Sequence, residues 1–96
     1  MTRMHDDTIV SRGSEHVEAE MAGQTVMMSI ARGKYFAIDG TGQTIWGLIA
    51  EPRRVGEIVD ILLDEYDVDR EVCREEVEGF VSELAANGLA VLRQQG

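Results

Sequence analysis

The sequence contains few side chains that could carry out catalysis by themselves. It has one cysteine, Cys73, and two histidines, His5 and His16. A thiol becomes a good nucleophile when a nearby base or cation lowers its pKa. Cys73 instead falls on the apolar stripe of a predicted helix and has acidic sequence neighbours, and both features raise a thiol pKa. We therefore interpret Cys73 as a packed core residue. Two isolated histidines also fall short of the convergent ligands that zinc requires.

A series of carboxylates in the C-terminal half has the spacing of a calcium-binding loop. Asp67, Asp69, Glu71 and Glu78 would be the first, third, fifth and twelfth residues of such a loop. The sixth residue would be Val72, where the loop requires glycine for its sharp turn. The same segment has the pattern of a helix start, so we predict no metal site there.

Glycines near the middle of the chain do not predict a phosphate-binding loop. The segment Gly40-Thr41-Gly42 is too short for one, and no lysine follows it. We interpret the segment as a turn between a strand and a helix, with Thr41 as the capping residue. Trp46 is expected to fill the space between sheet and helices. No group is left to carry a reaction, so we predict that the protein is not an enzyme and uses no cofactor or metal.

The composition is that of one small acidic domain. The chain has 96 residues, 44% of them hydrophobic, and a net charge of −9 from 18 acids and 9 bases, so it can form a single core. Residues 51–96 hold twelve acids and five bases, either as a solvated face or as a guide for a cationic segment. The charge opposes binding to nucleic acids and anionic membranes. Without a membrane-spanning run, a secretory signal or a cysteine pair, we predict a cytoplasmic protein.

The N-terminal half predicts a three-stranded antiparallel meander. Residues 1–14 are mixed and polar, and are expected to form a flexible arm that orders only on the body of the domain or on a partner. Apolar and polar residues alternate over residues 15–21 and 25–30, which predicts two strands whose apolar side chains share a face. Residues 34–38 are rich in β-formers and predict a third strand after a turn at Gly33.

The C-terminal half predicts three helices, each defined by apolar residues at helical spacing. Their expected extents are from Thr41 to Pro52, from Val55 to Tyr66, and from Arg70 to Asn87. The third helix has an inner stripe of Cys73, Val77, Phe80, Val81 and Leu84. Its end at Asn87-Gly88 is a typical stop signal, and a few extended residues follow. Strands followed by helices predict an α+β, winged-helix-like domain over residues 15–93, with the helices on one face of the sheet.

An ordered series of residues resembles the PqqD-like family. The series contains an aromatic strand, a Gly-Thr-Gly turn, an Ile-Trp pair, a Glu-Tyr-Asp segment and a Gly-Leu ending, and it extends over roughly residues 15–92. The residues concerned are Gly33–Gly42, Ile45, Trp46, Pro52, Val55, Ile58, Leu62, Glu65–Val68, Cys73, Val77, Phe80, Leu84, Gly88 and Leu89.

The resemblance implies a RiPP recognition element, a non-catalytic domain that binds the leader segment of a ribosomally made precursor peptide and presents it to modifying enzymes. The stand-alone form looks most like the recognition proteins of lasso-peptide clusters, which work beside a leader protease and a macrolactam-forming cyclase. The PqqD branch, which serves a radical-SAM enzyme in quinone cofactor biosynthesis, is the alternative within the family. A winged-helix DNA-binding regulator is a further alternative that the acidic third helix opposes.

The expected peptide site lies between the third strand and the third helix. A short third strand leaves an open edge to which an extended peptide, or a second copy of the chain, can add. Phe36 and Ile38 are expected to face the core. Gly79 costs the helix about 1 kcal/mol relative to alanine, which is consistent with a peptide passing close by. The predicted peptide-binding residues are Lys34, Tyr35, Phe36, Ala37, Ile38, Asp39, Val72, Glu76, Gly79 and Phe80.

Overall fold

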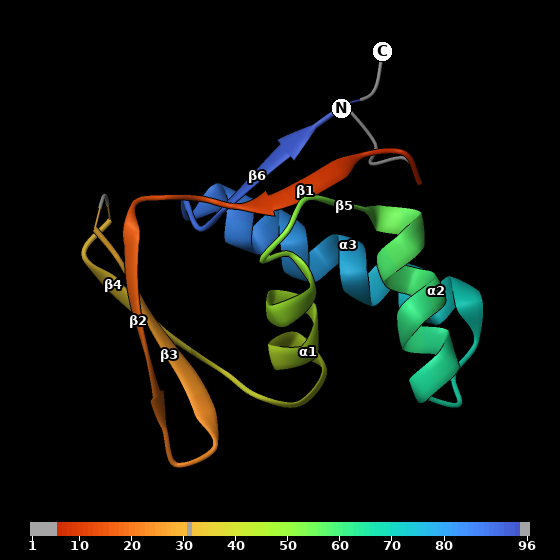
Figure 1. Cartoon of the computed structure of the whole chain (residues 1–96), viewed down its shortest axis with the longest axis horizontal. Coiled ribbons are helices and arrows are strands. Elements are labelled where there is room, and N and C mark those ends of the chain that lie inside the picture. The colour runs from red at the N-terminus through yellow and green to blue at the C-terminus, as the bar shows by residue number, and fades with distance from the viewer. Residues whose placement is uncertain (1–5, 31, 95–96) are drawn as a thin grey trace.

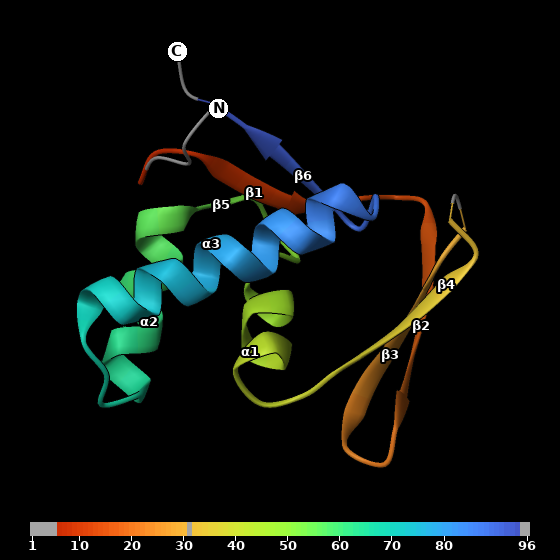
Figure 2. The ribbon, with the colours of Figure 1, turned by 180° about the vertical axis from the view of Figure 1, so that it is seen from behind.

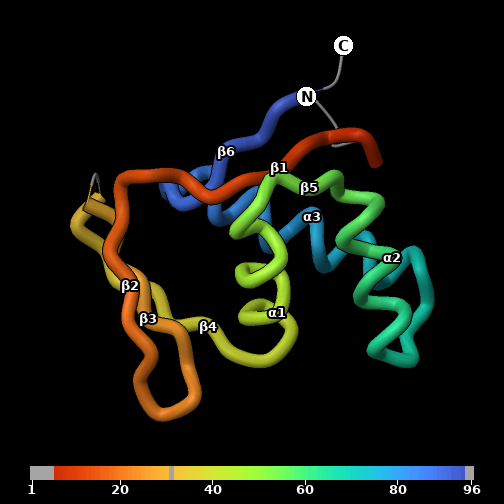
Figure 3. Tube along the Cα trace, in the orientation of Figure 1, coloured from red at the N-terminus to blue at the C-terminus, as the bar shows by residue number. Residues whose placement is uncertain are grey.

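The computed structural model describes residues 6–30 and 32–94 of the chain. The predictions for His5 and for the first part of the arm lie outside these residues. Within them, the chain forms two three-stranded sheets and three helices. One sheet stands at one side of the molecule, the helices occupy the middle and the opposite side, and the second sheet, which contains the first and last strands, lies above them (Figures 1 and 3).

The N-terminal meander forms the first sheet, named here the hairpin sheet. It consists of β2 (His16–Met21), β3 (Gln24–Ser29) and β4 (Lys34–Ile38). The strands are antiparallel in the order β2-β3-β4, and Met27 lies opposite both Glu18 and Phe36. The β2–β3 turn places Ala22 and Gly23 at φ values of 52° and 81°, as the two central residues of a tight hairpin turn require. The three predicted strands are confirmed.

The hairpin sheet turns its less hydrophobic face toward the core. In β3 the buried side chains are Thr25, Met27 and Ser29, whereas Val26 and Met28 alternate with them and point to the other side. Alternation predicts the strand from its period of two residues. It does not say which face is buried, because that depends on what packs against the sheet.

Three helices follow the hairpin sheet, as the sequence predicts. They are α1 (Gly40–Leu48), α2 (Val55–Glu65) and α3 (Arg70–Ala86). Their buried apolar residues belong to one core cluster that includes Trp46, which is 2% exposed and lies in the core as expected. The predicted cap of α1 is wrong: the helix begins at Gly40 with Asp39 as its N-cap residue, so Thr41 lies inside the first turn. Gly40 has a φ of 55°, a conformation that lets the chain turn sharply from β4 into the helix.

The carboxyl end of α3 follows its predicted stop signal. Gly88 has a φ of 75°, and the amide of Leu89 donates to the carbonyl of Leu84 at 2.8 Å. Leu89 thereby folds back into the core, where it is fully buried. The next residues are extended, as expected, and form β6 (Ala90–Arg93). None of the described helices is both long enough and apolar enough to cross a membrane.

A second sheet, absent from the prediction, includes part of the expected flexible arm. Its strands are β5 (Arg53–Arg54), β1 (Ile9–Arg12) and β6, in the antiparallel order β5-β1-β6. Val10 of the central strand is fully buried. Residues 9–12 of the expected arm are therefore ordered on the body of the domain, as the central strand of this sheet. The strand is four residues long and both its partners lie far along the chain, so the local sequence offers too short a pattern to identify it.

Candidate peptide-binding site

The edge of β4 that faces away from β3 has no strand partner among the described residues. Beside this edge lies the C-terminal half of α3 (Figure 2). A groove of about 340 Å³ separates the two elements and is named here the edge groove. Its lining residues are Tyr35, Phe36, Ala37, Ile38, Glu83, Leu84, Asn87 and Leu89. An unpaired strand edge that opens into a groove is a ready acceptor for an extended peptide.

Side chains of β4 alternate between the core and the solvent. Phe36 and Ile38 are half-buried and pack against the core, as predicted. Tyr35 is 74% exposed, and Ala37 is exposed beside it. The strand is therefore held by its inward pair, and its outer backbone edge has no strand partner in the part of the chain that the structure describes.

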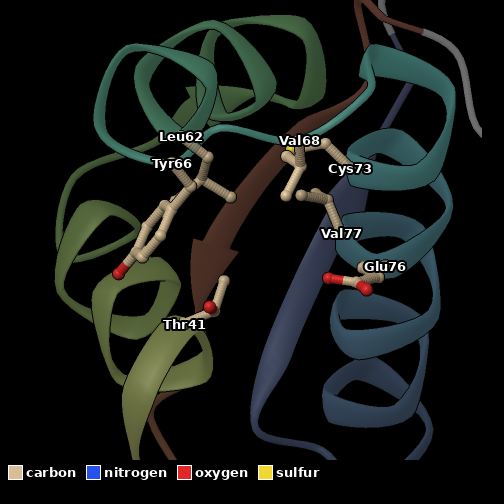
Figure 4. Close-up of a pocket in the computed structure, with 7 residues that line it drawn as sticks. All are labelled: Thr41, Leu62, Tyr66, Val68, Cys73, Glu76 and Val77. Atoms are coloured by element: carbon tan, nitrogen blue, oxygen red, sulfur yellow. The ribbon is translucent and has the colours of Figure 1, made fainter.

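A second hollow lies nearer the start of α3, and it is named here the helix pocket. It has a volume of about 70 Å³, and its lining residues are Thr41, Leu62, Tyr66, Val68, Cys73, Glu76 and Val77. Figure 4 shows these side chains converging from α1, the end of α2, the α2–α3 link and α3. The walls are mainly apolar, and Glu76 supplies a carboxylate. Such a pocket suits an apolar side chain with one polar or cationic end.

Phe80 lies between the two hollows. It comes one helical turn after Glu76 of the helix pocket and one turn before Glu83 and Leu84 of the edge groove. A β-carbon added to Gly42 would lie 3.2 Å from the Phe80 ring. Glycine at residue 42 therefore lets α1 and α3 approach closely, and the half-buried Phe80 packs against the core at this contact.

The remaining predicted site residues lie at the margins. Lys34 and Asp39 are exposed at the two ends of β4, where Asp39 accepts a hydrogen bond from Gln24 at 3.3 Å. Val72 is 48% exposed and lines neither hollow. Gly79 faces open space, since a β-carbon there would meet nothing within 4 Å. The structure thus places Tyr35 to Ile38 at the edge groove and Glu76 at the helix pocket, whereas Val72 and Gly79 line neither hollow.

Substituting Gly79 by leucine tests whether a bound peptide reaches that margin. We expect Gly79→Leu to keep or raise the stability of α3, because leucine is the better helix former. The isobutyl group would project beside Glu76 and Glu83, and we expect it to weaken leader-peptide binding about tenfold. Gly47→Leu is the matched control, because Gly47 is also helical and faces open space. Calorimetry and thermal melts of both variants would measure the effects, and unchanged peptide affinity in Gly79→Leu would exclude this margin from the site.

The two walls of the edge groove are joined at one end by hydrogen bonds. The buried hydroxyl of Ser29 donates to the backbone carbonyl of Asn87 at 3.0 Å, and it accepts from the Arg32 amide at 3.3 Å. The Arg32 guanidinium donates to the carbonyl of Ala86 at 3.0 Å. The β3–β4 turn therefore satisfies carbonyls that the last turn of a helix leaves free. These bonds fix the position of β4 relative to α3.

Removing the Ser29 hydroxyl should loosen the groove without touching the peptide. We expect Ser29→Ala to cost about 1 kcal/mol of unfolding free energy, because the carbonyl of Asn87 loses its donor and the amide of Arg32 loses its acceptor. We also expect weaker leader binding, through faster dissociation, because the walls are no longer held at a fixed separation. Denaturant titration and surface plasmon resonance would measure the two effects. A variant that loses stability but retains its dissociation rate would show that Ser29 only supports the fold.

The apolar and acidic surroundings of the helix pocket affect the pKa of Cys73. Burial raises the pKa of the Cys73 thiol above its ordinary value, Glu76 raises it further, and Arg70 opposes them. The direction agrees with the interpretation of Cys73 as a packed residue.

Among residues 6–30 and 32–94, no cluster of three metal-binding side chains occurs. Glu78 pairs with Arg74 on α3 at 3.0 Å.

Several residues of the site were not identified from the sequence. Leu84, Asn87 and Leu89 were recognised only as core or stop-signal residues, and Tyr66 and Val68 only as part of a link between helices. Their residue types give no signal of binding, because the fold, and not the residue type, places them at the hollows. Glu83 could have been found from the sequence, because its helical spacing places it on the same stripe of the helix as Glu76.

Comparison with known proteins identifies the family. The sequence profile described as "Coenzyme PQQ synthesis protein D (PqqD)" matches residues 24–90, which is most of the chain. The chain belongs to the PqqD family. This PqqD-family protein is also similar to a solved structure described as TbiB1 in complex with the TbiA(beta) leader peptide, with 31% sequence identity and a TM-score of 0.75. The match covers 90% of this chain and 98% of the other.

A second solved structure shares the fold at lower identity. It is described as lasso peptide synthetase B1 complexed with the leader peptide, and it is 21% identical with a TM-score of 0.75. The match covers 85% of this chain and 96% of that chain. No curated protein sequence matches this one significantly.

Proposed function

We propose that this PqqD-family protein is a RiPP recognition element, which binds the leader segment of a ribosomally synthesised precursor peptide and presents it to modifying enzymes. The observation that carries the proposal is the open edge of β4 across the edge groove from α3, in a chain 31% identical to a protein solved with a leader peptide. Like other PqqD-like recognition elements, the protein is a binding protein and not an enzyme.

The peptide is proposed to add to β4 as a further strand. Main-chain hydrogen bonds to residues 34–39 would supply affinity that depends little on sequence. Alternate peptide side chains would then point toward α3, where Glu76, Phe80 and Glu83 lie on one stripe. The helix pocket is open to one anchoring side chain, and Glu76 favours an anchor with a hydroxyl or a positive charge.

Lasso-peptide biosynthesis is the proposed setting. Both similar structures contain leader peptides, and one is described as a lasso peptide synthetase component. The protein would act as the B1-type component, beside a leader protease and a macrolactam-forming cyclase. The buried, unpaired Cys73 is compatible with a reducing compartment, and we place this assembly in the cytoplasm. The match to the PqqD profile favours one alternative, in which the protein binds a precursor peptide for a radical-SAM enzyme in quinone cofactor biosynthesis.

Calorimetry with the leader peptide encoded beside the gene tests the proposal. We expect one peptide of about 15–25 residues to bind each chain with a dissociation constant below about 10 μM, or roughly −7 kcal/mol. A scrambled leader of the same composition is the control for charge attraction. Absence of binding by folded protein would contradict the proposal, and selective binding of the precursor of a quinone cofactor would support the alternative branch.

A further inference from the structure

One face of the second sheet points away from the core and carries two arginines. It is named here the arginine face, and its residues are Ile9, Ser11, Arg54, Val91 and Arg93. Antiparallel pairing places Ile9 of the central strand between Arg54 of β5 and Arg93 of β6. Side chains that alternate with these, such as the buried Val10, turn toward the core. The arginine face therefore consists of two cations on either side of an apolar centre.

Both arginines lack an internal partner, although the chain contains twice as many acids as bases. Arg54 and Arg93 are exposed, and they form no ion pair or side-chain hydrogen bond within the part of the chain that the structure describes. The other described arginines donate to carboxylates or to backbone carbonyls, and these are Arg12, Arg32, Arg53, Arg70 and Arg74. An acidic protein therefore leaves two guanidinium groups free, and places both in one cross-strand row.

Acidic residues lie beside one end of the arginine face. Arg54 lines a polar groove of about 480 Å³ that Asp7 and Glu57 also line. Glu57 is paired with Arg53 at 2.9 Å, and Arg54 forms an ion pair with neither acid. The row Arg54–Ile9–Arg93 itself contains no carboxylate. The two cations are therefore open to carboxylates of another molecule.

The spacing of the two arginines defines the surface that would match them. Neighbouring strands lie about 4.8 Å apart, so the α-carbons of Arg54 and Arg93 lie about 10 Å apart across the central strand. Carboxylates two turns apart on a helix have about the same spacing. Each guanidinium can bind one carboxylate through two parallel hydrogen bonds, and Ile9 can contact an apolar side chain between the carboxylates. The matching surface is therefore acidic with an apolar centre.

We propose that the arginine face docks an acidic surface of the enzyme that acts on the precursor peptide beyond its leader. The inference rests on the proposed function, in which that enzyme is the macrolactam-forming cyclase. The second sheet lies above the helices, whereas the open edge of β4 lies at one side of the molecule (Figures 1 and 2). A leader in the edge groove therefore leaves the arginine face free, and an enzyme docked there does not compete with the leader.

Other acidic occupants fit the arginine face less well. Nucleic acids and anionic membranes are repelled by the net charge of −9. A symmetric dimer through this face would bring Arg54 and Arg93 against the same cations of the second copy. A head-to-tail contact with α3 of a second copy would cover Glu76 and Glu83, which the proposed leader site uses. A protein partner needs carboxylates only opposite the arginines, so the rest of its surface need not repel the chain.

The test measures binding of an inactivated cyclase, encoded with the precursor, to this protein alone, with leader peptide and with full-length precursor. We expect weak binding to the protein alone and no change with the leader peptide. The full precursor should tighten binding about tenfold or more, because the cyclase then also holds the segment beyond the leader. Biolayer interferometry would measure the three affinities.

Charge-removing variants of the arginine face should weaken this binding in all three cases. We expect Arg54→Gln and Arg93→Gln to weaken it about threefold each, as for exposed ion pairs, and about tenfold together. Ser82→Glu is the matched control, because it also lowers the net charge by one unit, at an exposed position of α3. Cyclase binding should be unchanged in Ser82→Glu. Leader affinity, measured by calorimetry, should be unchanged in both arginine variants, because the edge groove lies elsewhere.

Four outcomes would overturn the docking surface. The first is absence of cyclase binding, or normal binding when both arginines are replaced. The second is equal weakening by Ser82→Glu, which would indicate an effect of net charge alone. The third is a loss of leader-protease binding, and not of cyclase binding, in the arginine variants. The fourth is self-association in sedimentation velocity that Arg93→Gln abolishes, which would assign the face to a second copy. Failure of the unmodified protein to bind the leader would instead reject the proposed function.

Discussion

Methylating single backbone amides of the leader peptide is expected to weaken binding at every second position of a short stretch, and to change it little at the positions between. A strand directs the amide and carbonyl of alternate residues toward each neighbour. The acceptor strand β4 is five residues long, so the sensitive stretch should be similarly short. Each sensitive methylation removes a donor and leaves a β4 carbonyl unpaired, which costs about 1–3 kcal/mol. The methyl group also obstructs the approach of the strands.

Fluorescence anisotropy with a series of singly methylated leaders would measure this pattern. We expect losses of about tenfold or more at the alternate positions. Methylation outside the stretch is the internal control, because it changes peptide conformation without touching β4. Losses at every consecutive position of the stretch would indicate a helical peptide in the edge groove, because every internal amide of a helix donates within the helix, and would contradict strand addition.

Replacing Trp46 by alanine is expected to remove much of the stability of the fold. Its ring is buried, its indole N–H donates to Glu18 at 3.3 Å, and Arg12 lies 4.4 Å above the ring centroid. His16 contacts the ring edge, with the centroids 5.2 Å apart. These contacts join α1 to β1 and to the hairpin sheet. Truncation of a buried tryptophan costs about 3–5 kcal/mol, which is a large part of the 5–15 kcal/mol typical of a domain.

Urea unfolding followed by far-ultraviolet circular dichroism would measure this loss, since the variant lacks the single tryptophan as a fluorophore. Trp46→Phe is the matched control. It keeps an aromatic ring under Arg12 and loses the donor to Glu18, so we expect a smaller loss, of about 1–3 kcal/mol. A loss below about 1 kcal/mol in Trp46→Ala would mean that the two sheets are held together without this residue.

The local sequence determined the strands of the hairpin sheet, the three helices and the family. The strand and helix periods are visible within single segments, because each element repeats its side-chain direction every two or 3.6 residues. The stop at Gly88 and the core position of Cys73 followed from the same local reasoning. The strand at residues 34–38, which is the proposed acceptor of the peptide, was also predicted, since its β-formers and flanking turns are contiguous in the chain.

The binding residues were predicted less completely than the elements that carry them. Tyr35 to Ile38 line the edge groove and Glu76 lines the helix pocket, and that they bind a peptide stays a prediction. Asn87 and Leu89 join the groove because the chain folds back after α3. Val72 has the right residue type but lies outside both hollows. A helix stripe can be read from sequence, but which part of it meets another element depends on how the two elements cross.

Tertiary structure alone decided three features of this protein. Residues 9–12 became a central strand because β6, some eighty residues later in the chain, pairs with them. Met27, and not its neighbours Val26 and Met28, became buried because the helices cover that side of β3. The groove exists because Ser29 and Arg32 hold the hairpin sheet against the end of α3. In each case the deciding contact joins segments distant in sequence, and neither segment by itself specifies the other.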